Sequence, residues 1–108
     1  MFDAAQKAVA VDFARTLAAR DYARAHTMLS ANLRSALTAD AMQERFEFMI
    51  PLDFGDVAPI EIVTDPSWDD LFVYVSLGGP IYSEAIIVSA FAEEDGRQTI
   101  DAVEFGRP

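Results

Sequence analysis

The sequence predicts a single α+β domain in which a helical N-terminal half packs on a C-terminal antiparallel sheet. Apolar residues recur at helical spacing in the first half, and neither Gly nor Pro occurs before Pro51. After Pro51, runs rich in Val, Ile, Phe and Tyr alternate with Gly- and Pro-containing turn signals, a pattern typical of strands. The 108 residues predict one domain, 1–108, with no room for a second.

Residues that favour helix ends divide the first half into helical segments. Asp21 and Thr38 are predicted N-caps, because their side chains can accept hydrogen bonds from the first turn of a helix. An apolar stripe repeats every four residues from Ala5 to Leu17. These signals predict helices over 4–20, 22–29 and 39–50, with a short helical turn at 33–37.

The second half predicts four strands, at 57–64, 70–77, 81–92 and 98–105. Gly78–Gly79 and Asp95–Gly96 suit two-residue hairpin turns, because both dipeptides accept positive φ at low cost. These turns set the register of the sheet. The predicted cross-strand pairs are Val88–Val103, Ile86–Phe105, Val73–Glu84 and Val75–Tyr82.

Strict alternation of side chains then gives the predicted sheet two faces. We expect the helices to cover the more aliphatic face, which carries Leu71, Val73, Val75, Tyr82, Glu84, Ile86, Val88, Asp101, Val103 and Phe105. The outer face carries an apolar patch of Phe72, Tyr74, Ile87, Phe91 and Ile100. Exposed patches of this kind often mark protein interfaces, so we expect a homodimer formed through the outer sheet face.

The net charge of −10 disfavours nucleic acid and anionic membrane surfaces as partners. A basic protein or a small apolar ligand fits this charge better. The absence of Cys excludes a disulfide scaffold and a zinc–thiolate site, and no motif for a cofactor or metal is present. The N-terminus has no apolar signal segment, and no run of apolar residues is long enough to span a membrane, so we expect a cytoplasmic protein.

Glu84 is the strongest candidate for acid–base chemistry. The predicted register places it on the helix-covered face among aliphatic neighbours, where a desolvated carboxyl group can serve as a general acid or base. The simpler alternative is a cross-strand pair with Arg107, which requires no function. Tyr82 shares the same predicted face and is a further candidate for a pocket.

Three polar residues of the helical half, together with Met49 and Trp68, have two possible interpretations each. Tyr22 and His26 lie four residues apart on one side of a predicted helix, which suits proton transfer, although a lone His is also typical of a surface. Asp40 either projects into a pocket or stabilises the dipole of the third helix. Met49 belongs either to the core or to an adaptable apolar pocket wall. Trp68, in an acidic loop, either anchors a ligand or covers the core.

The order of these predicted elements is shared with a known superfamily of domains. A helix with Phe13 and Leu17 is followed by the segment 21–25, and another helix begins after Leu37. Antiparallel strands then close on Val103–Phe105. In this pattern the chain resembles the NTF2-like (cystatin-like, SnoaL-like) superfamily over nearly its whole length.

The resemblance implies helices held by a curved four-stranded antiparallel sheet around a cone-shaped cavity, and frequent dimerisation through the outer sheet face. Family enzymes such as ketosteroid isomerases and polyketide cyclases use acidic and tyrosine groups in that cone. Tyr22, Asp40 and Glu84 are the nearest candidates by type and location, while the His–Asp pairing of the cyclases is not recognisable.

The sequence therefore leaves two functions open, besides a purely structural accessory domain with a filled interior. The first is a non-enzymatic, dimeric ligand-binding or protein-interaction domain of NTF2-like type. The second is a small NTF2-like enzyme or carrier that acts on an apolar small molecule by general acid–base chemistry. The candidate pocket residues are Tyr22, His26, Asp40, Met49, Tyr82 and Glu84.

Overall fold

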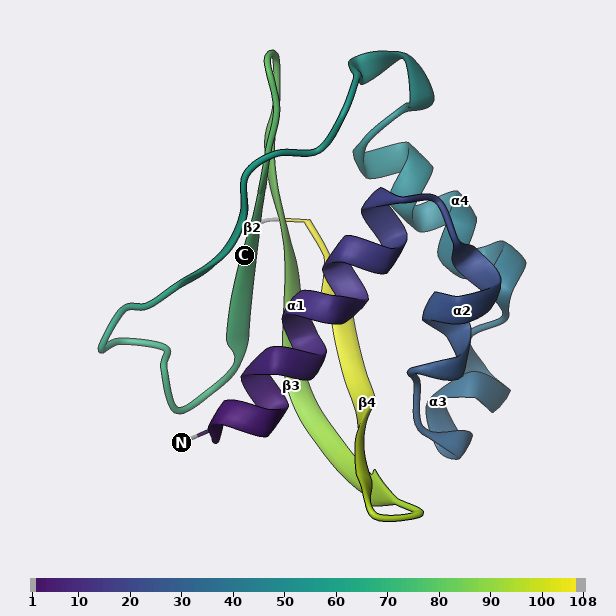
Figure 1. Cartoon of the computed structure of the whole chain (residues 1–108), viewed down its shortest axis with the longest axis vertical. Coiled ribbons are helices and arrows are strands. Elements are labelled where there is room, and N and C mark those ends of the chain that lie inside the picture. The colour runs from purple at the N-terminus through teal and green to yellow at the C-terminus, as the bar shows by residue number, and fades with distance from the viewer. Residues whose placement is uncertain (1, 107–108) are drawn as a thin grey trace.

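The computed structural model describes residues 2–106. Over this range it confirms the predicted α+β class: helices in the first half cover one face of a four-stranded antiparallel sheet (Figure 1). The helices are α1 (Ala4–Ala18), α2 (Tyr22–Thr27), α3 (Ala31–Ala36) and α4 (Ala39–Met49), followed by a 3₁₀ turn at Leu52–Phe54. The strands are β1 (Ile60–Val63), β2 (Val73–Gly78), β3 (Ser83–Glu94) and β4 (Arg97–Phe105).

Side-chain caps fix the starts of the helices, as the sequence predicts for Asp21 and Thr38. The Asp21 carboxylate accepts a hydrogen bond from the Arg24 amide, and the Thr38 hydroxyl accepts one from the amide of Ala41. Asp3 also caps α1, where its carboxylate and the Gln6 side chain form a reciprocal capping box. The chain thus changes direction at short polar segments between the helices.

The sheet has the strand order β1-β2-β3-β4, and each neighbouring pair is antiparallel. The predicted β3–β4 register is confirmed at Val88–Val103 and Ile86–Phe105. Its turn is formed by Asp95 and Gly96, with φ of +53° and +76°. This hairpin could be predicted because its turn is specified locally by two residues.

The predicted register between β2 and β3 is wrong. Val73 pairs with Val88 instead of Glu84, and Val75 pairs with Ile86 instead of Tyr82. Gly78 belongs to the sheet: its carbonyl accepts a hydrogen bond from Ala58 N–H at 2.7 Å, so residues 79–82 form the connection. The register shift is an even number of residues, and β2 therefore keeps its predicted faces.

Leu71 precedes β2 and is 63% exposed, so its predicted position on the helix-covered face is wrong. The predicted outer positions of Phe91 and Ile100 are also wrong, because both pack on the core side. Beyond Val88 the regular pairing is interrupted by two successive irregularities, after which Phe91 pairs with Ile100. Such irregularities add residues to a strand and change which side chains face the core. Simple alternation along the sequence cannot anticipate them.

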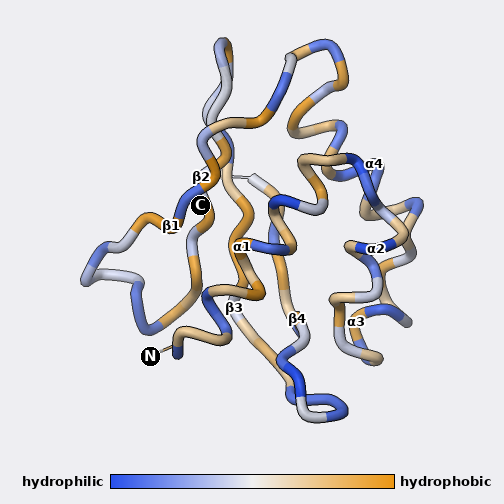
Figure 2. The backbone as a smooth tube through the Cα atoms, in the orientation of Figure 1, coloured by the Kyte–Doolittle hydropathy of each residue, from blue (hydrophilic) through white to orange (hydrophobic). Residues whose placement is uncertain are grey.

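Large apolar side chains fill the space between the helices and the sheet. Figure 2 shows hydrophobic residues concentrated along β2 and β3, with hydrophilic residues at the turn between β3 and β4. The largest fully buried side chains include Phe13, Leu17, Leu29, Met42, Phe46, Ile50, Leu77, Ile86 and Ile100. Because these side chains occupy the centre, space for a ligand lies at the edge of the helix layer.

On the outer face, the indole of Trp68 stacks on the rings of Phe72 and Tyr74, with centroid distances of 5.8 and 5.5 Å. Ile87 retains only 4% exposure. The predicted apolar patch is therefore smaller than the sequence suggests, since Trp68 lies over part of it. In the described part of the chain, the helices are too short or too polar to cross a bilayer.

Candidate functional site

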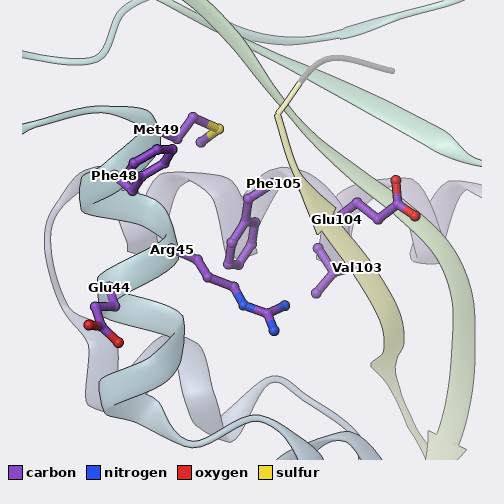
Figure 3. A pocket seen from close by; sticks show the side chains of 7 residues that line it. All are labelled: Glu44, Arg45, Phe48, Met49, Val103, Glu104 and Phe105. Carbon is purple, nitrogen blue, oxygen red and sulfur yellow. The ribbon is translucent and has the colours of Figure 1, made fainter.

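A groove of about 580 Å³ lies between α4 and β4, and its residues are shown in Figure 3. Its lining residues are Glu44, Arg45, Phe48, Met49, Val103, Glu104 and Phe105. The volume is within the range of small-molecule sites, roughly 300–1,000 Å³. The groove is open to solvent, unlike the filled interior.

The helical side of the groove follows from the spacing of aromatic residues on α4. Phe46 is fully buried in the core, and Phe48, two residues later, points to another side of the helix. Phe48 is 91% exposed, the largest exposed fraction among the large hydrophobic residues described. Met49 is half-buried and packs against the core beside it.

The strand side follows from alternation along β4. Val103 and Phe105 are half-buried and pack against the core, while Glu104 is exposed. Figure 3 shows the Phe105 ring between the strand and α4, with the Arg45 side chain extending from the helix towards β4. The groove thus has an apolar floor, with charged groups at its rim.

Tyr22, the first predicted pocket residue, lies in a polar cluster that joins the ends of helices. Its hydroxyl donates a hydrogen bond to Glu47 Oε2 at 2.8 Å and accepts one from Arg20 Nη1 at 3.2 Å. Burial is the main cause that raises the pKa of the Tyr22 phenol, with a contribution from Glu47, while Arg20 acts in the opposite direction. The phenol is therefore a stable hydrogen-bond donor at neutral pH.

Arg20 and Glu47 are members of this cluster that sequence reasoning did not identify. Arg20 Nη2 donates to the carbonyl of Ile50 at 3.2 Å, and the guanidinium carbon lies 5.0 Å from the centre of the Phe46 ring. These contacts connect the end of α1 with the end of α4. Glu47 is 25 residues from Tyr22 in the sequence, so no local spacing could have revealed the pair.

His26 hydrogen-bonds through Nε2 to the carbonyl of Leu37, at 2.8 Å. A carbonyl only accepts, so Nε2 carries the proton in this contact. Tyr22 and His26 are thus bonded to different parts of the helical layer, and this arrangement does not support their predicted proton transfer. The bond to Leu37 instead fixes the segment that leads into α4.

The remaining predicted residues lie elsewhere. Asp40 is exposed in the first turn of α4, where it stabilises the helix dipole. The Tyr82 hydroxyl donates to the carbonyl of Asp56 at 2.9 Å, and its ring stacks on Phe54. Burial is the main cause that raises the Tyr82 pKa. Glu84 is half-buried and pairs with Leu77.

Of the six predicted pocket residues, Met49 alone lines the α4–β4 groove. Tyr22 and His26 belong to the helix layer, whereas Tyr82 and Glu84 lie near the β2–β3 connection. Arg107, the alternative partner of Glu84, lies outside the described residues. The signal that could have indicated the groove is Phe48, a large apolar residue out of phase with the buried stripe of its helix.

No group of three or more His, Cys, Asp or Glu within residues 2–106 is arranged to hold a metal ion. Comparisons of the chain with protein-family models, curated proteins and solved structures give no match. The geometry of the chain itself is therefore the basis for inferring its function.

Proposed function

We propose that the chain is a small, non-enzymatic binding domain of NTF2-like type, and that its α4–β4 groove receives an apolar group of a ligand or partner protein. The exposure of Phe48 carries this proposal. The Phe48 ring is 91% exposed beside a groove with an apolar floor, so it gains the free energy of burial only when another molecule covers it.

The order of the elements supports the NTF2-like assignment. Helices come first and lie on one face of an antiparallel sheet, in which the twelve-residue strand β3 is visibly bent (Figure 1). The assignment rests on this arrangement and on the sequence pattern around residues 21–25. It implies nothing by itself about chemistry, because one fold supports many functions.

The positions of the acid–base candidates favour binding over catalysis. The Tyr22 and His26 side chains are engaged in contacts that join the helices, and Asp40 is exposed at a helix start. The alternative, an enzyme or carrier using Glu84, has one supporting observation: Glu84 is half-buried, at the strand position across from Leu77. Glu84 does not line the α4–β4 groove.

Homodimerisation through the outer sheet face is a separate proposal, supported by the aromatic stack of Trp68, Phe72 and Tyr74. Native mass spectrometry of the freshly purified protein tests it and also detects a retained ligand. We expect the wild-type protein to be a dimer and the Ser76→Arg variant to be a monomer. Ser76 lies on β2 between Glu61 and Ala85 and shares the outer face with Tyr74, so Arg would place a charge in the interface. A wild-type monomer at micromolar concentration would contradict the dimer alone.

The groove itself is tested by NMR titration with indole, a neutral aromatic probe. We expect shift changes at the amides of Arg45, Phe48 and Phe105, and at least threefold weaker binding to the Phe48→Ser variant. Ile81→Ser is the matched control, because Ile81 is 71% exposed at the β2–β3 connection, away from the groove. Equal effects of the two substitutions, or shifts confined to another surface, would refute the proposed site.

A further inference from the structure

The outer edge of β4 is covered along only one part of its length. Near its start, the segment around Leu29 forms a parallel bridge with Ile100. The Ser30 amide donates to the Ile100 carbonyl at 2.7 Å, and the Ile100 amide donates to the Met28 carbonyl at 2.9 Å. These two bonds pair the outward amide and carbonyl groups of Ile100, where the helix layer contacts the edge of β4.

Farther along β4, alternation shows which backbone groups point away from β3. The Gly106 amide donates to the Ala85 carbonyl at 2.9 Å, so this position belongs to a hydrogen-bonded pair. In an antiparallel ladder the next pair is not hydrogen-bonded, and its amide and carbonyl groups point outward. The register Ile86–Phe105 and Val88–Val103 therefore places the outward groups on Phe105 and Val103.

The open part of the edge coincides with the groove. Val103 and Phe105 both line the groove, opposite Phe48. Among residues 2–106, the hydrogen bonds that join separate segments do not include the outward groups of Val103 or Phe105. An unpaired strand edge is a template for another extended chain, which can bond to it through its backbone.

The charges of this region favour a basic occupant. Glu44 and Glu104 line the groove with one cation, Arg45, and the whole chain has a net charge of −10. A second copy would bring the same negative charge to the edge, whereas a basic segment is attracted to it. Because side chains alternate, an added strand would direct one set towards Phe48 and the other towards the face of Glu104.

From these observations we propose that the open edge of β4, at Val103 and Phe105, binds an extended segment of a basic partner protein by strand addition. Apolar side chains of that segment cover Phe48 and the groove floor, and basic side chains alternate with them. The inference rests on the proposed role of the groove and adds the class of partner and the mode of binding.

The test uses a capped six-residue peptide of alternating Lys and Val, and measures amide hydrogen exchange by NMR. With saturating peptide, exchange of the Val103 and Phe105 amides should slow at least tenfold, because both become hydrogen-bonded. A peptide of alternating Glu and Val should bind at least tenfold more weakly. Lack of amide protection with millimolar Lys–Val peptide, or equal binding of both peptides, would overturn the proposal.

Val103→Pro separates strand addition from simple apolar contact. The Val103 amide points outward, so proline removes a donor for the added strand and preserves the ladder bonds to β3. We expect affinity for the Lys–Val peptide to fall about tenfold, as the loss of one well-placed hydrogen bond and close backbone approach predicts. A Lys–Val peptide that is N-methylated at alternate residues should show a similar loss on the wild-type protein, even if the proline variant does not fold.

These measurements distinguish binding in the groove from strand addition at the edge of β4. If Phe48→Ser weakens peptide binding but Val103→Pro and N-methylation do not, the groove binds the peptide and strand addition is wrong. If neither substitution nor N-methylation has an effect, both the groove and the strand addition are refuted. If the two amides become protected without peptide as protein concentration rises, a second copy occupies the edge and the basic segment is the wrong occupant.

Discussion

The hydroxyl of Ser30 donates a hydrogen bond of 2.6 Å to Oδ1 of Asp101, across 71 residues of sequence. The same hydroxyl oxygen accepts a hydrogen bond from the Leu33 amide and so caps α3. Ser30 is only 1% exposed, which protects both contacts from water. One side chain therefore connects the helical layer to β4.

Replacement of Ser30 by Ala removes the helix cap and leaves the Asp101 carboxylate without this donor. We expect the free energy of unfolding to fall by about 1–3 kcal/mol, measured by urea denaturation. Ser35→Ala is the control, because Ser35 is exposed and its hydroxyl bonds only within α3. Equal stability of the two variants would show that the Ser30–Asp101 bond contributes nothing.

Arg20 combines a strained backbone with favourable side-chain contacts. Its φ of +62° is in the left-handed region, where Gly is more stable than other residues by about 1 kcal/mol. Arg20→Ala should lose the contacts to Tyr22, Ile50 and Phe46 and keep the strain. We expect Arg20→Gly to unfold at a higher denaturant concentration than Arg20→Ala, and the reverse order would contradict the backbone argument.

The phenol of Tyr22 should make stability depend on alkaline pH. Its pKa is raised in the folded chain above the ordinary value of 10.0, so the folded state retains a proton that the unfolded state releases. This contribution to stability is complete below pH 10 and is lost as the pH rises through the folded-state pKa. Urea denaturation between pH 8 and 11.5 should show a smaller loss for Tyr22→Phe than for wild type.

Tyr82 also has a raised pKa, so Tyr82→Phe should reduce the alkaline loss as well. The double variant should show a smaller pH dependence than either single variant. If Tyr22→Phe leaves the alkaline slope unchanged, the phenol has the same pKa in the folded and unfolded chain.

Gly79 is required by the position of a neighbouring ring. A Cβ atom added at Gly79 would collide with the ring of Tyr82, which stacks on Phe54 and donates a hydrogen bond to Asp56. Gly79→Ala should therefore cost about 1–3 kcal/mol of stability. The substitution in a Tyr82→Ala background should cost much less, since the obstructing ring is absent. Equal costs in the two backgrounds would exclude the collision as the cause.

The accuracy of the sequence predictions depends on how local their causes are. The caps Asp21 and Thr38 act within one helical turn, and the Asp95–Gly96 turn sets the β3–β4 register directly. The β2–β3 register fails because Gly78 bonds to the segment at Ala58 and Pro59, a partner that no local pattern specifies. Local signals thus predict the turn and register of the β3–β4 hairpin, whereas the β2–β3 register and the core-side positions of Phe91 and Ile100 depend on features that no local pattern specifies.

The groove was inaccessible to sequence reasoning for a related reason. Periodicity identifies Met42 and Phe46 as a buried stripe, but it does not determine which strand lies beside the other sides of α4. The sequence predicts Met49 in either the core or a pocket wall, and in the structure Met49 both packs against the core and lines the groove. The contribution of Phe48 to a binding site is visible only in the structure, where β4 lies across the groove from α4.

The two irregularities between β3 and β4 have a further consequence for how this domain tolerates insertions and deletions. Ser89 and Asp101 are each additional to the regular ladder, one in each strand, and the pairing from Phe91 onward returns to the register it had before Val88. Deleting both residues would give an uninterrupted ladder with the same core faces. That shorter sheet would lack the carboxylate that Ser30 contacts, so the additional residue in β4 provides the anchor of the helical layer.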